Sequence, residues 1–236
     1  MTTEKKSTAP TWSSKEELAP GIFVYRDVLK KEFDIINRLE STIGPVGSKE
    51  KRYSYQPAYV GYQQLMPDYR DCVDFKFKKS DIYLDKSEDA EKLKSLWQDV
   101  YDAQYPAVVD YCKIYNIMEL KYWEAFNFIK YGESQHFMEH QDHGYSYNCV
   151  LSLVGYVNDD YEDGGLYFRL QGLDIKPKAG DLYVFPSNFM YAHQAKAVTK
   201  GTKYSIVTML DYSKKFHTPD MYDPKWDNEV NENNSI

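Results

Sequence analysis

Residues 122–131 read YWEAFNFIKY and begin the part of the chain that decides the fold. Four further short segments follow at 149–157, 166–170, 181–185 and 204–210, and all are rich in Val, Leu, Tyr and Phe. Turn residues, mainly Gly, Asn, Asp and Pro, separate the segments. Short strands at this spacing are typical of a sandwich or jelly roll. We therefore predict a double-stranded β-helix, the cupin-like jelly roll.

The chain before this stretch has the spacing of helices. A β-branched and aromatic run over 21–25 predicts a strand, and apolar residues recurring over 28–39 predict an amphipathic helix. Ser87 is expected to cap a second helix, which Pro106 is expected to kink or divide. Helices first and strands later indicate an α+β protein whose N-terminal helices support one face of the jelly roll.

The length of 236 residues favours one domain with an N-terminal extension. Residues 1–18 are mostly polar and are predicted to be a disordered lead-in. A single domain is expected over 19–215, with its jelly-roll core at about 122–212. The acidic segment 216–236 is expected to be a C-terminal tail.

Charge and cysteine content limit the classes of partner. The 29 basic and 36 acidic residues give a net charge of −7, and no basic cluster is interleaved with aromatic residues, so neither a nucleic acid nor a membrane is expected as partner. We find no signal peptide and no transmembrane segment, which predicts a cytoplasmic protein. Cys72, Cys112 and Cys149 are too widely spaced for a zinc site and odd in number for a disulfide framework.

The five histidines contain one metal-binding pattern. Only His140 is followed two residues later by a carboxylate, Asp142, and in a strand this spacing directs both side chains to the same face. Together with His193, they form a set of two imidazoles and one carboxylate. Such a set can bind one face of a ferrous ion and leave the opposite face open. The pattern predicts an iron site.

A lysine follows the second histidine of this pattern at a spacing that is compatible with a second binding group. Lys203 comes ten residues after His193, and Ser205 would lie on the same strand face. A buried cation there could pair with the distal carboxylate of a metal-bound 2-oxo diacid, with the hydroxyl as a further donor. By itself, Lys203 is better explained as an ordinary edge-strand lysine, which discourages strand aggregation.

Motifs in a fixed order carry a family resemblance. From Tyr131 to Asp211 the chain resembles the iron- and 2-oxoglutarate-dependent dioxygenases, and it is most similar to their prolyl 4-hydroxylase branch. The N-terminal run from Ala19 to Val24 resembles the first strand of that branch. The motifs are Tyr131-Gly132, His140-x-Asp142, Tyr156-Val157-Asn158, Gly164-Gly165, Gly180-Asp181, Phe185-Pro186, and His193 followed by Gly201-x-Lys203-x-Ser205.

The resemblance implies an enzyme and a role for each of these residues. His140, Asp142 and His193 would ligate Fe(II) and would thus be the catalytic residues, while Lys203, Tyr131 and Ser205 would bind 2-oxoglutarate. The list of expected small molecules is Fe(II), 2-oxoglutarate and O2, with ascorbate as a candidate reductant. The expected reaction hydroxylates an unactivated C–H bond.

One departure from the family pattern concerns the substrate. Aligning on Tyr156 places Cys149 where the branch commonly has a substrate-binding arginine. Proline in a protein or peptide is the first expectation, and a free amino acid or small metabolite is the alternative. A non-catalytic jelly-roll binding protein is an alternative of another class. His143 and Cys149 are candidate substrate contacts, and the oligomeric state stays open.

Overall fold

The larger of the two main β-sheets forms the middle of the molecule. The computed structural model describes residues 10–60, 64–144 and 148–213. In the larger sheet the order is β1-β2-β15-β11-β18-β9-β7-β5, all antiparallel, and β8 also pairs with β18. The strands are β1 Lys15–Ala19, β2 Ile22–Tyr25, β5 Gln56–Pro57, β7 Val73–Phe77, β8 Tyr122–Trp123, β9 Phe126–Tyr131, β11 Leu151–Tyr156, β15 Leu182–Pro186 and β18 Lys203–Asp211.

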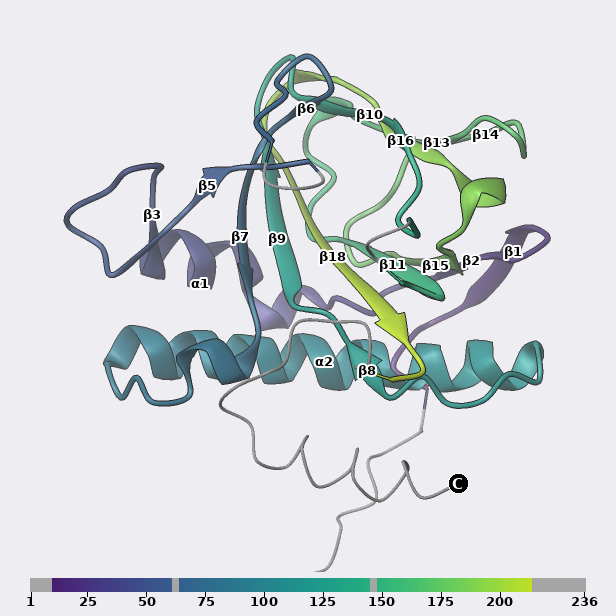
Figure 1. Ribbon diagram of the computed structural model, residues 1–236, viewed down its shortest axis with the longest axis horizontal. Coiled ribbons are helices and arrows are strands. Elements are labelled where there is room, and N and C mark those ends of the chain that lie inside the picture. The colour runs from purple at the N-terminus through teal and green to yellow at the C-terminus, as the bar shows by residue number, and fades with distance from the viewer. Residues whose placement is uncertain (1–9, 61–63, 145–147, 214–236) are drawn as a thin grey trace, which may run out of the picture.

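A smaller sheet faces the larger one, in the order β14-β13-β16-β10-β6. In Figure 1 its strands lie along the top, with the larger sheet below. These two opposed antiparallel sheets are the predicted double-stranded β-helix, so the predicted fold class is confirmed. The strands are β6 Arg70–Asp71, β10 His136–His140, β13 Leu166–Phe168, β14 Leu173–Ile175 and β16 His193–Ala195; the pairs β3 Ile43–Gly44 with β4 Tyr53–Ser54, and β12 Glu162–Asp163 with β17 Val198–Lys200, are separate.

Strand β11 shows why the sequence forms this core. All six of its residues are buried, because β15 pairs on one side, β18 pairs on the other, and both faces are covered. Its sequence, LSLVGY, is accordingly a nearly continuous apolar run instead of an alternating one. Ser152 is the exception, a fully buried hydroxyl in the centre of the sheet.

The helices cover the larger sheet. In Figure 1, α2 (Glu88–Ile114) runs along the bottom, and α1 (Ile35–Thr42) lies beside it. One core cluster joins Leu93 and Leu96 of α2 to Phe126 and Phe128 of β9. The predicted cap is present, since Ser87 Oγ accepts a hydrogen bond of 3.2 Å from the Ala90 amide.

The short 3-10 helices are η1 Lys31–Phe33, η2 Lys79–Ile82 and η3 Phe189–Tyr191. No helix in the described ranges is both long and apolar enough to cross a membrane.

The structure corrects two helix predictions. Helix α2 is continuous through Pro106, so the proline does not divide it; the proline is buried on the packed face, where burial offsets the loss of one hydrogen bond. The first helix begins at Ile35, later than predicted. Val28 and Leu29 are instead buried in a turn that follows β2, where both amides donate to the Gly180 carbonyl.

The predicted lead-in also ends earlier than expected. Strand β1 (Lys15–Ala19) lies largely within the predicted disordered segment 1–18. Its polar sequence forms a strand because it pairs with β2, and Lys15 forms an ion pair of 2.6 Å with Asp110 of α2. Residues 1–9 and the predicted tail 216–236 lie outside the described residues. The remaining domain boundaries stay predictions.

Candidate metal centre

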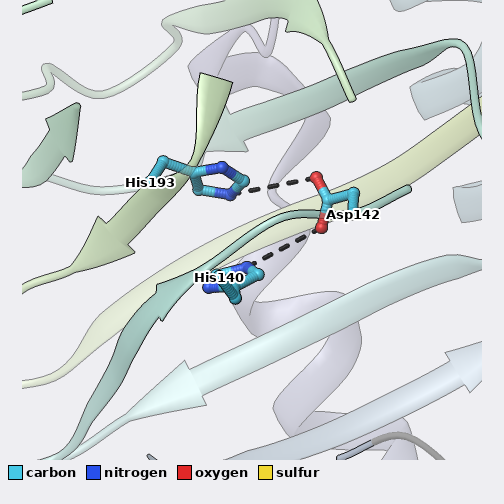
Figure 2. A group of neighbouring side chains, drawn as sticks. All are labelled: His140, Asp142 and His193. Carbon is cyan, nitrogen blue, oxygen red and sulfur yellow. Dashed lines mark ion pairs between the residues drawn. The ribbon is translucent and has the colours of Figure 1, made fainter. Parts of the chain in front are cut away.

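Strands β10 and β16 bring the two histidines of the predicted iron site together. His140, the last residue of β10, is the direct register partner of His193, the first residue of β16. Asp142 follows two residues after His140 and completes the group. One ligand atom from each of the three side chains lies within 4.8 Å of the other two, and Figure 2 shows the carboxylate beside the two rings, with one oxygen directed toward each. The structure thus places the three predicted ligands around a common point.

The local geometry differs from the expectation in one respect. Strand β10 ends at His140, so Asp142 lies in the following loop, and strand alternation does not align the two side chains. His193 also begins a strand of its own, three residues long, that the sequence did not predict. Such a short segment, HQA, carries no periodicity from which a strand can be recognised.

Backbone carbonyl groups orient both imidazoles. His140 Nδ1 lies 2.9 Å from the Met138 carbonyl, and His193 Nδ1 lies 3.1 Å from the Tyr191 carbonyl. A carbonyl oxygen only accepts, so this network assigns the proton of each ring to Nδ1. Each Nε2 then carries its lone pair toward the carboxylate of Asp142. This arrangement is the usual one for metal-binding histidines.

The charge of Asp142 and the burial of His140 both favour the binding of a cation. Asp142 Oδ1 lies 3.7 Å from His140 Nε2, and Asp142 Oδ2 lies 3.8 Å from His193 Nε2. The pKa of His140 is lowered, first by burial and then by the neighbouring His193, which favours the neutral ring that a metal requires. Two imidazoles and one carboxylate are a donor set that fits Fe(II).

A stack of side chains that the sequence did not single out supports His140. The ring of Phe137 lies parallel to the His140 ring, with centroids 3.6 Å apart. Arg70 of β6 also packs over the Phe137 ring, with its guanidinium carbon 4.7 Å from the ring centroid. The sequence could have indicated Phe137 through its position three residues before His140. Arg70 is distant in sequence, and only the pairing of β6 with β10 shows that it lies beside Phe137.

Lys203 and Tyr131 lie in the larger sheet as direct register partners. Lys203 is 1% exposed, with Nζ 4.1 Å from the centre of the Tyr131 ring, and it donates a hydrogen bond of 2.9 Å to the Gly164 carbonyl. Within the described residues, no acidic side chain forms an ion pair with it. Burial therefore lowers the pKa of Lys203 to about 7. A buried ammonium group without a counter-ion is a good partner for a ligand carboxylate.

The other predicted contacts surround these groups. Ser205 is 5% exposed and follows Lys203 on the same face of β18, where its register partners are Ile129 and Tyr156. The pKa of Tyr131 is raised well above its usual value by burial, so its hydroxyl stays protonated and can donate. The edge-strand interpretation of Lys203 is wrong, because β18 is an interior strand between β9 and β11.

The two candidate substrate contacts lie against each other. His143 Nδ1 is 2.8 Å from the Cys149 carbonyl, and the His143 amide donates to the Ser187 carbonyl. Cys149 is 3% exposed, and burial, together with nearby Asp142, raises the pKa of its thiol. A role for either residue in substrate binding remains a prediction.

The comparisons with known proteins agree with this geometry. Residues 126–210 match the model of the 2OG-Fe(II) oxygenase superfamily. The structure is similar to that of a prolyl hydroxylase from Trichoplax adhaerens, solved with a peptide fragment of the hypoxia inducible factor oxygen degradation domain; the TM-score is 0.59 at 15% identity, over 81% of this chain and 83% of that chain. A prolyl-4-hydroxylase from Pseudomonas putida matches with a TM-score of 0.51 at 16% identity, over 81% and 92% of the two chains. No curated protein sequence matches significantly.

Proposed function

We propose that the chain is a dioxygenase that uses Fe(II), 2-oxoglutarate and O2, and that it hydroxylates a prolyl residue in a protein or peptide. The prolyl hydroxylase fold supports the substrate class. The observation that carries the proposal is the position of the His140, Asp142 and His193 group on the smaller sheet, with buried Lys203 on the larger one.

Each group has a chemical task in this proposal. His140 and His193 would hold Fe(II) through Nε2, and Asp142 would hold it through a carboxylate oxygen. When bound, the metal supplies the centre at which 2-oxoglutarate and O2 react and a C–H bond becomes an alcohol. Lys203 would pair with the distal carboxylate of 2-oxoglutarate, and Tyr131 would donate its hydroxyl proton. These two residues orient the cosubstrate, and the buried surroundings exclude water.

The first experiment tests the iron and cosubstrate sites together. We expect the wild-type protein to develop a visible metal-to-ligand charge-transfer band when Fe(II) and 2-oxoglutarate are added without oxygen. His140→Ala should lose the band. His136→Ala is the matched control, because its ring contacts the backbone carbonyls of Ser134 and Asp68 and lies outside the metal group. A wild-type protein without the band, or a His140→Ala variant that keeps it, contradicts the proposal.

The second experiment identifies the substrate. A peptide library is incubated with the loaded enzyme and read by mass spectrometry for a gain of one oxygen, with succinate release measured in parallel. Hydroxylated proline supports the proposal. The replacement of the usual arginine by Cys149 favours a free amino acid or small metabolite as second candidate, and hydroxylation of such compounds alone would select it. Failure of every candidate to stimulate succinate release would favour a binding protein.

A further inference from the structure

A buried hydroxyl group on the larger sheet reaches across to the metal group on the smaller one. Ser152, the second residue of β11, is 0% exposed, and its Oγ lies 2.5 Å from Asp142 Oδ2. Its Oγ also lies 2.8 Å from the Oγ of Ser187, which is 2% exposed and follows β15. The three side chains form a continuous chain of hydrogen bonds from the sheet interior to the carboxylate.

From this geometry we propose that Ser152, supported by Ser187, is a positioning residue that restricts Asp142 to one metal-binding oxygen, Oδ1. The inference rests on the proposed function, because it concerns how that site holds its metal. It adds residues that neither the sequence pattern nor the metal group itself contains.

The direction of the hydrogen bonds follows from the chemistry of the groups. An ionised carboxylate only accepts, so the single hydroxyl proton of Ser152 must be donated to Asp142. Ser152 Oγ can then only accept from its other neighbour, so Ser187 donates to Ser152. Both bonds point toward the carboxylate, and each strengthens the other in a site from which water is excluded.

The two oxygens of Asp142 therefore differ. Oδ2 lies 3.8 Å from His193 Nε2 and receives the bond from Ser152, while Oδ1 lies 3.7 Å from His140 Nε2 and receives no hydrogen bond from the described residues. A carboxylate without such a bond can rotate or bind a metal through both oxygens. Holding Oδ2 would leave Oδ1 as the oxygen through which Asp142 holds the metal.

The backbone around Ser187 anchors the same arrangement. The Ser187 amide donates to the Val150 carbonyl, next to β11, and the Ser187 carbonyl accepts from the amide of His143. His143 is the residue directly after Asp142. Ser187 thus holds the loop that carries the carboxylate as well as the hydroxyl that contacts it.

A purely structural role is the competing explanation. A serine inside the apolar run LSLVGY costs stability unless its hydroxyl finds a partner, and Asp142 could simply be that partner. A structural pair would affect protein stability alone. A positioning role must also change metal affinity and the electronic spectrum of the bound metal.

The test is an anaerobic titration of the metal-free protein with Fe(II) alone, followed by addition of 2-oxoglutarate. We expect Ser152→Ala to weaken Fe(II) binding by roughly 10- to 100-fold, the usual effect of losing such a hydrogen bond, and to shift the maximum of the charge-transfer band. Ser152→Thr keeps a hydroxyl and should restore affinity and band position. Ser187→Ala, which leaves the direct bond to Asp142, should have a smaller effect in the same direction.

Thr42→Val is the matched control, because it removes a buried hydroxyl without a hydrogen-bond partner on α1, far from the metal group in the fold. Should Ser152→Ala not fold, Ser152→Cys replaces the hydroxyl by a weak donor of similar size and gives the same comparison. A folded variant with Fe(II) affinity within about twofold of wild type and an unshifted band overturns the inference. If the wild-type protein itself binds no Fe(II), the proposed function fails instead.

Discussion

Lys203 shows how one buried residue can be costly for folding and useful for binding. Its ammonium group is almost fully buried, and its hydrogen bond goes to a neutral carbonyl, that of Gly164. An uncompensated buried charge destabilises a protein, since no ion pair offsets the free energy lost when the charge is removed from water. A ligand carboxylate would supply the missing partner. Lys203 should therefore lower the stability of the ligand-free protein and raise the stability of the protein with bound 2-oxoglutarate.

Lys203→Met is expected to separate these effects. The binding of 2-oxoglutarate should weaken by roughly 30-fold or more, in line with the loss of one partner of a buried charge pair. The ligand-free protein should become more stable, because the buried charge is gone. Calorimetric titration and thermal unfolding measure the two quantities. Lys200→Met removes an exposed lysine from the neighbouring β17 and should change neither. Unchanged 2-oxoglutarate affinity in Lys203→Met would contradict the assigned role.

The pH dependence of binding follows from the same residue. In the ligand-free protein the pKa of Lys203 is lowered to about 7 by burial, so above pH 7 the folded protein loses this charge. Binding a carboxylate requires the ammonium form and raises that pKa again. The affinity for 2-oxoglutarate should consequently fall above pH 7, by up to about tenfold per pH unit, with uptake of a proton. Titration calorimetry in buffers of different ionisation enthalpy measures the uptake, and an affinity independent of pH from 7 to 9 contradicts it.

Lys203 also contributes to stability in a defined pH range. Its ordinary pKa is 10.5, and its folded value is about 7, so between these values the unfolded chain binds more protons than the folded one. The contribution of this residue to the stability of the ligand-free protein therefore rises with pH across that range.

Short strands are the elements that create the metal group. β10 and β16 together place His140 opposite His193, although β16 spans only three residues. The long elements, α2 and β18, were readily predicted because their patterns extend over many residues. Strand β16 was not predicted, since its three residues form a strand through their neighbours in the sheet, whereas the equally short β13 lies in the predicted segment 166–170.

Helix α2 gives a test at the scale of an element. Ser87→Ala removes the hydroxyl that accepts from the Ala90 amide and should lower the free energy of unfolding by about 1 kcal/mol. Ser87→Asp keeps an accepting oxygen at the cap and should retain the stability. Chemical unfolding measures both. Neither substitution should alter 2-oxoglutarate affinity, because the cap lies at the end of a helix that covers the other face of the larger sheet. A stability unchanged by Ser87→Ala would show that the cap bond contributes nothing.

At the scale of the whole molecule, the metal group and the lysine lie on different sheets. His140 and His193 belong to the smaller sheet, while Lys203 and Tyr131 belong to the larger one. A cosubstrate that contacts both must link the two layers. Ligand binding should thus stabilise the fold as a unit.

Thermal unfolding with and without ligands tests this link. At a free 2-oxoglutarate concentration 100 times its dissociation constant, the Fe(II)-loaded protein should gain about 2.7 kcal/mol of stability. A chelator should remove the gain. Lys203→Met at the same concentration should keep the increment from Fe(II) and lose most of the increment from 2-oxoglutarate, whereas His140→Ala should lose both. Equal ligand-induced gains in all three proteins would contradict the two-sheet arrangement.

The sequence by itself determined the jelly roll, the covering helices and the residue types of the site, because alternating or continuous apolar runs and the His140, Asp142 and His193 pattern are local properties. The tertiary structure decided which distant residues support that pattern. Ser152 approaches Asp142 from another sheet, and Arg70 reaches His140 through Phe137 from β6. The reason is physical: a hydrogen bond or a ring stack depends on distance in space, and strand pairing alone determines which parts of the chain become neighbours.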